Sequence, residues 1–199
     1  MRKLYVAPII HPSDPEDVTS YYLRRESIMS YHAFSETVDE ISEKLKNEKI
    51  DKIFIEGSLR KKPVNIIKSE LVRRLCNNLG VRKIEKTESV GSFLAQLASS
   101  QLFNTPFEKM FSVFVKKRDY EMARYVSKGL KDEETGLILF GAVHRPECYV
   151  DMFSDDIKMR YVTSREEMFK KMLEIMKRSS KRFANLNEDY SKKMFEQSA

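Results

Sequence analysis

Three side chains that can bind metals or transfer protons follow short apolar runs in this sequence. They are His11, Glu56 and His144, and the two histidines are among only three in the chain. Two imidazoles and a carboxylate suit a borderline divalent cation such as zinc, manganese or cobalt, and they can also transfer protons without a metal. A bound metal would lower the pKa of its water and supply a nucleophile near neutral pH. The pattern predicts a shared site, provided that the fold brings the three residues together.

A second candidate group is the string Arg118-Asp119-Tyr120-Glu121-Met122-Ala123. On a helix Arg118 and Met122 share one face, whereas Asp119 and Ala123 are neighbours on another, where the small Ala123 permits close packing. The arginine and the aspartate have two interpretations. They can form an ion pair on the helix surface, which adds little stability. Alternatively, Arg118 can bind an anionic or carbonyl oxygen with its forked donors.

The elements that must position these residues alternate along the chain. Short apolar runs predict strands at residues 3–10, 52–55, 81–85, 137–140 and 158–162. Capping residues and apolar stripes predict helices near residues 13–17, 34–45, 63–79, 90–102 and 105–126, and a basic amphipathic helix from residue 164. This alternation predicts an α/β fold: a layered, mainly parallel sheet flanked by helices, with a C-terminal amphipathic helix. Such sheets bind ligands outside the carboxyl ends of their strands, where the three residues are expected.

Length and composition limit the class of protein. The chain has 199 residues, of which 41% are hydrophobic and 33% charged. We expect an α/β domain over residues 1–163, with a helix and tail at residues 164–199 packed on the same domain. No apolar run approaches the ~20 residues that a membrane span needs, and the start lacks the pattern of a signal peptide. The expectation is therefore a cytoplasmic protein without a membrane partner.

Cysteine spacing and charge exclude further classes. Cys76 and Cys148 lie on unrelated segments without metal-binding or disulfide spacing, so reduced thiols are expected. The formal net charge is +6, but 36 basic and 30 acidic residues are interspersed. This mixture is typical of a solvated surface and does not favour nucleic-acid binding.

Four motifs occur in order over roughly residues 3–150 and together are more specific than any one of them. They are Pro8-Ile9-Ile10-His11, Ile53-Phe54-Ile55-Glu56, the string from Arg118 to Ala123, and Gly141-Ala142-Val143-His144. Their order resembles the TraB/TIKI family, within a superfamily that includes erythromycin-esterase-like and ChaN-like proteins. Two residues depart from the family pattern: Pro8 replaces a glycine and Val143 replaces a small residue. Both changes bear on how closely the backbone can approach a ligand.

The resemblance implies a metal-dependent hydrolase-like site for a peptide or small-molecule substrate. His11, Glu56 and His144 would be metal ligands or acid–base groups, and Arg118 would orient substrate or stabilise developing charge. The esterase branch of the resemblance implies instead an acid–base enzyme without a metal. A hypothesis from another class is a non-catalytic ligand- or partner-binding protein whose basic helix, at residues 170–182, binds an acidic partner or nucleic acid. The sequence leaves the substrate, the metal and a homo-oligomeric state open.

Overall fold

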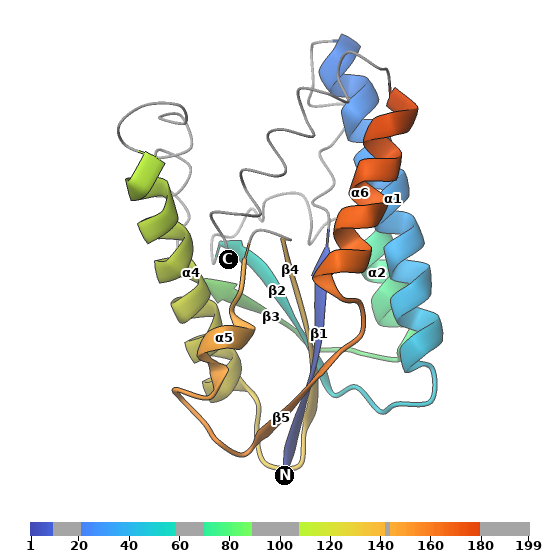
Figure 1. The fold of residues 1–199 in the computed structure, drawn as a ribbon. Coiled ribbons are helices and arrows are strands. Elements are labelled where there is room, and N and C mark those ends of the chain that lie inside the picture. Colours follow the sequence, from blue (N-terminus) through green and yellow to red (C-terminus); the bar gives the residue numbers. More distant parts are fainter. Residues whose placement is uncertain (10–20, 59–69, 89–107, 142–143, 180–199) are drawn as a thin grey trace.

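A five-stranded parallel sheet forms the centre of the molecule. The computed structural model describes residues 1–9, 21–58, 70–88, 108–141 and 144–179 (Figure 1). The strands are β1 (Arg2–Ile9), β2 (Lys52–Ser58), β3 (Ile84–Glu88), β4 (Thr135–Gly141) and β5 (Ile157–Tyr161). Their order is β3-β2-β4-β1-β5, and every neighbouring pair is parallel. The predicted layered α/β fold is confirmed, with the predicted strand at residues 137–140 in the middle of the sheet.

Helices cover both faces of the sheet (Figure 1). On one side are α1 (Tyr21–Leu45), α2 (Glu70–Asn78) and α6 (Arg165–Ser179). On the other side are α4 (Glu108–Gly129) and the short α5 (Glu147–Val150). In the described part of the chain, no helix has the length and apolar character needed to span a membrane.

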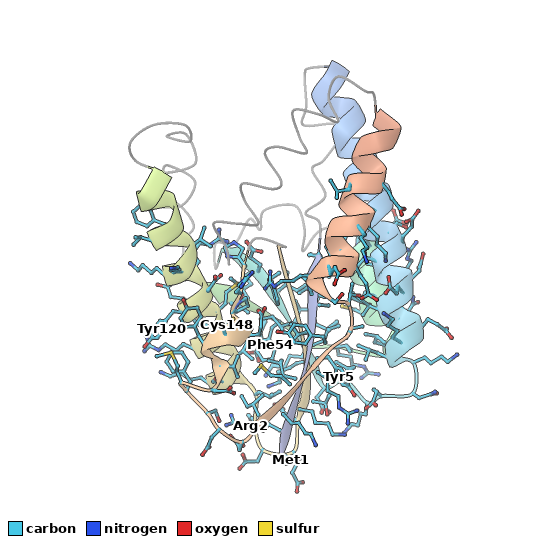
Figure 2. The ribbon with its side chains drawn as sticks, viewed as in Figure 1. Met1, Arg2, Tyr5, Phe54, Tyr120 and Cys148 are labelled. Carbon is cyan, nitrogen blue, oxygen red and sulfur yellow. The ribbon has the colours of Figure 1, made fainter. Side chains whose placement is uncertain are left out.

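Strand alternation divides the core into two layers, because successive side chains of a strand point to opposite faces. Ile53 and Ile55 of β2 pack with α1 and α2, whereas Phe54 packs with α4. Leu137 and Leu139 of β4 follow the first pattern, whereas Ile138 and Phe140 follow the second. Side chains fill the space between the sheet and the helices on both sides (Figure 2). This alternation decides which helix each polar side chain of a strand meets.

The bounds of β2 and β3 differ from the prediction by three residues, more than those of the other strands. β3 begins only at Ile84, because Val81 belongs to the C-terminal cap of α2. Gly80 has a positive φ of 65°, and the backbone N–H of the next residue, Val81, donates to the Cys76 carbonyl. This is the Schellman arrangement that Gly favours. β2 continues to Ser58, so Glu56 lies within the strand near its end. The helices predicted at residues 13–17 and 90–102 lie outside the described residues, as does the first part of the one at 63–79.

The C-terminal amphipathic helix begins where it was predicted. Ser164 and Glu167 form a reciprocal capping box, in which the Glu167 N–H donates to Ser164 Oγ and the Ser164 N–H donates to Glu167 Oε2, at 3.1 and 2.8 Å. Met168 is fully buried, as expected for a core methionine, and Lys171 pairs with Glu40 of α1. The two cysteines are not paired with each other; Cys76 is buried and Cys148 is exposed.

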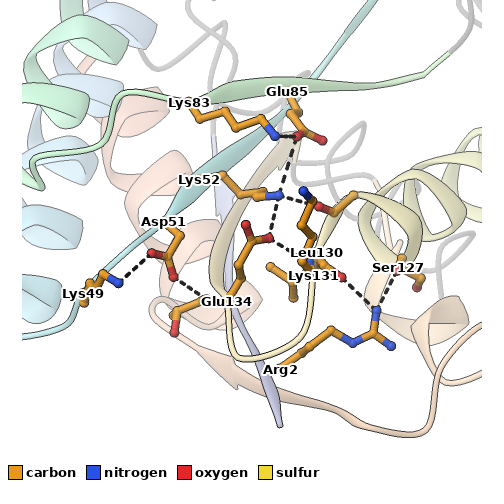
Figure 3. A network of polar contacts seen from close by, with 12 residues as sticks. Arg2, Lys49, Asp51, Lys52, Lys83, Glu85, Ser127, Leu130, Lys131 and Glu134 are labelled. Atoms are coloured by element: carbon orange, nitrogen blue, oxygen red, sulfur yellow. Dashed lines mark hydrogen bonds and ion pairs between the residues drawn. The ribbon is translucent and has the colours of Figure 1, made fainter.

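A buried lysine joins β2 to the end of α4 at the amino-terminal edge of the sheet (Figure 3). Lys52 donates to the Gly129 carbonyl, and its Nζ lies 2.6 Å from Glu134 and 3.7 Å from Glu85. The Lys52 side chain is 1% exposed, whereas the two carboxylate side chains are 25% and 27% exposed. Lys83 contacts the same Glu85 from the surface. The lysine is thus the buried centre of a network whose rim reaches solvent.

Replacing this buried lysine is expected to destabilise the fold. In Lys52→Met a part-buried carbonyl and two carboxylates lose a cationic partner, so the free energy of unfolding should fall by on the order of 3 kcal/mol. Lys83→Met removes an exposed partner of the same Glu85 and should change stability little. Urea denaturation of both variants measures the difference. Equal effects of the two substitutions would contradict the structural role given to Lys52.

Candidate functional site

Glu56 brings a buried carboxylate to the carboxyl-terminal edge of the sheet, on the side of α4. It lies two residues after Phe54 in β2 and therefore points to the same face. Oε1 accepts a hydrogen bond from Arg118 Nη2 at 2.6 Å, and Oε2 accepts one from the Gly141 N–H at 2.5 Å. The second contact follows from the register, because Ile55 pairs with Leu139 on the neighbouring strand. Glu56 is 7% exposed.

His144 lies between two carboxylates. Its Nδ1 is 2.6 Å from Asp119 Oδ1, and its Nε2 is 3.1 Å from Glu56 Oε1. Its backbone N–H donates to the Gly141 carbonyl at 2.9 Å, which holds the residue just beyond the end of β4. The ring is 1% exposed. Both ring nitrogens are therefore occupied by carboxylate partners.

The helix α4 supplies Arg118 and Asp119 from consecutive positions. Both are buried, at 4% and 3% exposure, and they contact different partners, Glu56 for the arginine and His144 for the aspartate. Met122 and Ala123, one turn later, are fully buried against the sheet. The interpretation of the pair as a helix-surface ion pair is wrong, because both side chains are buried at the middle of α4. The structure agrees better with the other interpretation, in which Arg118 binds an anionic oxygen, although this oxygen is Glu56 Oε1 of the protein itself.

Electrostatics keep the His144 ring protonated. Burial by itself would lower its pKa, but the negative charges of Glu56 and Asp119 and their hydrogen bonds outweigh burial and raise the pKa from 6.5 to about 9. At neutral pH the ring is therefore an imidazolium that donates through both nitrogens. The two carboxylates are then balanced by two cations, the imidazolium and the Arg118 guanidinium. We call these four residues the acid–histidine cluster.

A further arginine holds the backbone of the cluster. Arg165, the first residue of α6, donates to the His144 carbonyl and to Glu147 Oε1, the latter at 2.5 Å. Its guanidinium carbon lies 5.6 Å from the centre of the Phe140 ring. Sequence analysis missed Arg165, since its partner lies 21 residues earlier, and it also left Asp119 out of the site. The string at residues 118–123 could have indicated that Asp119 belongs to the site, because it lies next to Arg118. No comparable pattern in the sequence indicated a role for Arg165.

Three of the four predicted site residues converge, namely Glu56, Arg118 and His144. His11 lies outside the described residues; β1 ends at Ile9, which pairs with Gly141. Within the described ranges there is no group of three or more histidine, cysteine, aspartate or glutamate side chains arranged to hold a metal ion. The metal therefore stays a prediction, for which Glu56 Oε1 and His144 Nε2 are the two neighbouring donor atoms.

Comparisons with protein-family models, with curated proteins and with solved structures find no match for this chain. The resemblance to the TraB/TIKI family therefore stays a prediction from the four motifs. Any function assigned to the cluster has to be argued from its own geometry and charge.

The raised pKa of His144 predicts that stability falls with pH. Because the pKa is higher in the folded state, this contribution is complete below pH 6.5 and disappears as the pH rises through 9. Between pH 6 and pH 10 the free energy of unfolding should fall by on the order of 3 kcal/mol from this group. Urea denaturation across this range measures the fall.

The matched control is His144→Gln, which removes the titrating ring. Burial also raises the pKa of the Cys76 thiol and the Tyr5 hydroxyl, so some alkaline destabilisation should remain in this variant. The difference between the two proteins isolates His144. If both lose stability equally between pH 6 and pH 10, the ring is not a buried imidazolium.

Proposed function

We propose that this protein is a hydrolase whose acid and base are His144 and Glu56. The observation that carries the proposal is the continuous contact series Asp119–His144–Glu56–Arg118, in which one carboxylate orients the imidazole and a second faces its other nitrogen. A base, an acid and an orienting group within hydrogen-bond reach are what acid–base hydrolysis requires. The cluster lies at the edge of a parallel sheet where ligands commonly bind.

The protonation state assigns the roles. An imidazolium with a pKa of about 9 can donate a proton at neutral pH but cannot accept one, so His144 is the general acid and Glu56 the general base. Asp119 fixes the ring through Nδ1. Arg118 fixes the Glu56 carboxylate.

The proposed reaction is hydrolysis of an ester or amide in a small molecule or peptide. Glu56 takes a proton from water, and the water oxygen forms a bond to the carbonyl carbon. The carbonyl carbon–oxygen or carbon–nitrogen bond to the leaving group then breaks, and the leaving group takes a proton from His144. Glu56 Oε1 and His144 Nε2 are 3.1 Å apart, so the proton can pass back directly and restore both groups. Low exposure of all four side chains strengthens these interactions.

The metal-dependent form remains a second proposal. A carboxylate on the far nitrogen of a histidine is a common partner of metal-binding imidazoles, and Asp119 holds that position. Against this, the Arg118 guanidinium binds the same Glu56 oxygen that faces Nε2, so it would lie close to the cation. These contacts favour the metal-free form. In the metal-dependent form Glu56, His144 and the sequence-predicted His11 would hold zinc, manganese or cobalt, which would supply a water of lowered pKa.

The partner-binding hypothesis receives less support from α6. The basic residues that would bind an acidic partner include Lys170, Lys171, Lys177 and Arg178. Of these, Lys170 pairs with Glu166 and Lys171 with Glu40. The side chains of the other two, Lys177 and Arg178, lie outside the described residues. Part of the positive charge of this helix is thus already neutralised.

Glu56→Gln tests the base. It keeps the shape of the side chain but cannot accept the proton, so kcat should fall by about 10²- to 10⁴-fold. The assay is a panel of p-nitrophenyl esters and fluorogenic peptides, with folding checked by circular dichroism. Glu166→Gln, an exposed glutamate of α6, is the matched control and should retain activity.

The same assay separates the two forms of the proposal. Protein treated with a chelator should keep its activity in the metal-free form, whereas activity that returns only with added zinc, manganese or cobalt supports the metal-dependent form. The hydrolase proposal is wrong if no substrate of the panel is turned over with or without metal, or if Glu56→Gln matches the control.

The pH dependence of the reaction tests the acid. If His144 donates the proton, kcat should be lost as the pH rises through about 9, because the ring then becomes neutral. A rate that instead increases up to pH 9 would make His144 the base and reverse the two roles. Steady-state rates between pH 6 and pH 10 distinguish these outcomes.

A further inference from the structure

We infer that Arg165 is a positioning residue that holds the imidazole of His144 between its two carboxylates, and that α6 thereby controls the geometry of the site. The inference rests on the proposed function for its effect on catalysis, but the positioning itself can be measured without activity. It goes beyond the acid–histidine cluster, because Arg165 is not one of its four residues and reaches the backbone of His144.

The backbone of His144 is held from two elements. Its N–H donates to the Gly141 carbonyl at the end of β4, and its carbonyl accepts from Arg165 at the start of α6. The Gly141 N–H in turn donates to Glu56. The turn that carries the imidazole is thus fixed on one side by the strand that contacts Glu56, and on the other side by α6.

The position of Arg165 is itself determined by several contacts. Its side chain is 14% exposed, lies beside the Phe140 ring and pairs with Glu147, whose side chain is 5% exposed. Glu147 Oε2 is buried without a hydrogen-bond partner among the described residues. The ion pair between Arg165 and Glu147 Oε1 therefore supplies the positive charge next to this carboxylate. Loss of the guanidinium would leave a buried charge three residues from His144, and the turn would have to move to solvate it.

The capping box of α6 fixes where Arg165 begins the helix. Ser164 and Glu167 hold the first turn, and Lys171 attaches the next turn to Glu40 of α1. The guanidinium therefore extends from a fixed point toward β4. Both hydrogen bonds come from one nitrogen, Nη2, so a lysine ammonium at this point could make part of these contacts. It would lack the planar guanidinium that lies beside the Phe140 ring.

Histidine nuclear magnetic resonance tests the positioning directly. Protein labelled with 15N-histidine is recorded at pH 7, and His144→Gln assigns the signal among three histidines. Short charge-assisted hydrogen bonds to Asp119 should give the ring proton on Nδ1 a low-field resonance. We expect this resonance to shift or vanish in Arg165→Met, to be restored in part in Arg165→Lys, and to persist in Lys170→Met, a surface control on the same helix.

Kinetics supply the second readout. With an ester substrate, Arg165→Met should lower kcat by about 10²-fold, the effect of displacing a reacting group by about 1 Å, while KM changes little.

Should Arg165→Met fail to fold, the double variant Arg165→Met with Glu147→Gln removes both charges of the pair and is used instead. An unchanged His144 resonance in a folded variant overturns the inference. Absence of hydrolysis with a displaced resonance would refute the proposed function and leave the positioning intact.

Discussion

The site depends on one imidazolium, that of His144, held between the carboxylates of Asp119 and Glu56. Two carboxylates buried this close together repel each other and have lost most of their hydration, so a cation between them is required. The ring meets this requirement with one proton on each nitrogen. It also joins three parts of the chain, since Asp119 belongs to α4, Glu56 to β2 and His144 to the turn after β4. The raised pKa of His144 and one of the attachments of α4 to the sheet are two consequences of the same contact.

Contacts with strand β2 hold α4 at a fixed position along the sheet, so that Asp119 meets His144. Lys52, Phe54 and Glu56 alternate with apolar residues and face α4, so that side of the strand carries a cation, an aromatic ring and an anion in turn. Lys52 binds the last turn of α4 at Gly129, and Glu56 binds Arg118 eleven residues earlier. A helix rises about 1.5 Å per residue and a strand about 3.3 Å, so the two spans are similar in length. Polar contacts at both ends therefore fix α4 along the strand, which apolar packing at Phe54 alone would not do.

Sequence reasoning succeeded where a pattern is local and failed where it depends on a distant partner. Apolar runs and the capping box at Ser164 are local, and they identified β1, β2, β4 and α6. The parallel sheet then brought Glu56 and His144 to one edge. The start of β3 was misplaced because Val81 belongs equally well to a strand or to a helix end, and Gly80 decides between them only through its backbone conformation. The inward orientation of Asp119 and the contact of Arg165 with His144 depend on tertiary packing that no spacing encodes.

The two polar ends of β2 differ in a way that separates structural from chemical roles. Around Lys52 the carboxylates are about one quarter exposed, so solvent shares the cost of burying the charges, and the network needs no further explanation than the attachment of α4. Around His144 all four side chains are at most 7% exposed. Apolar residues of similar volume would commonly stabilise such a position as well or better, so burial of four charges is costly if stability is its sole purpose. A buried ionisable group with a strongly shifted pKa, such as His144 at the carboxyl-terminal edge of a parallel sheet, is typical of functional sites. This contrast is the physical reason why we propose a chemical role for the carboxyl-terminal edge and a structural role for the opposite one.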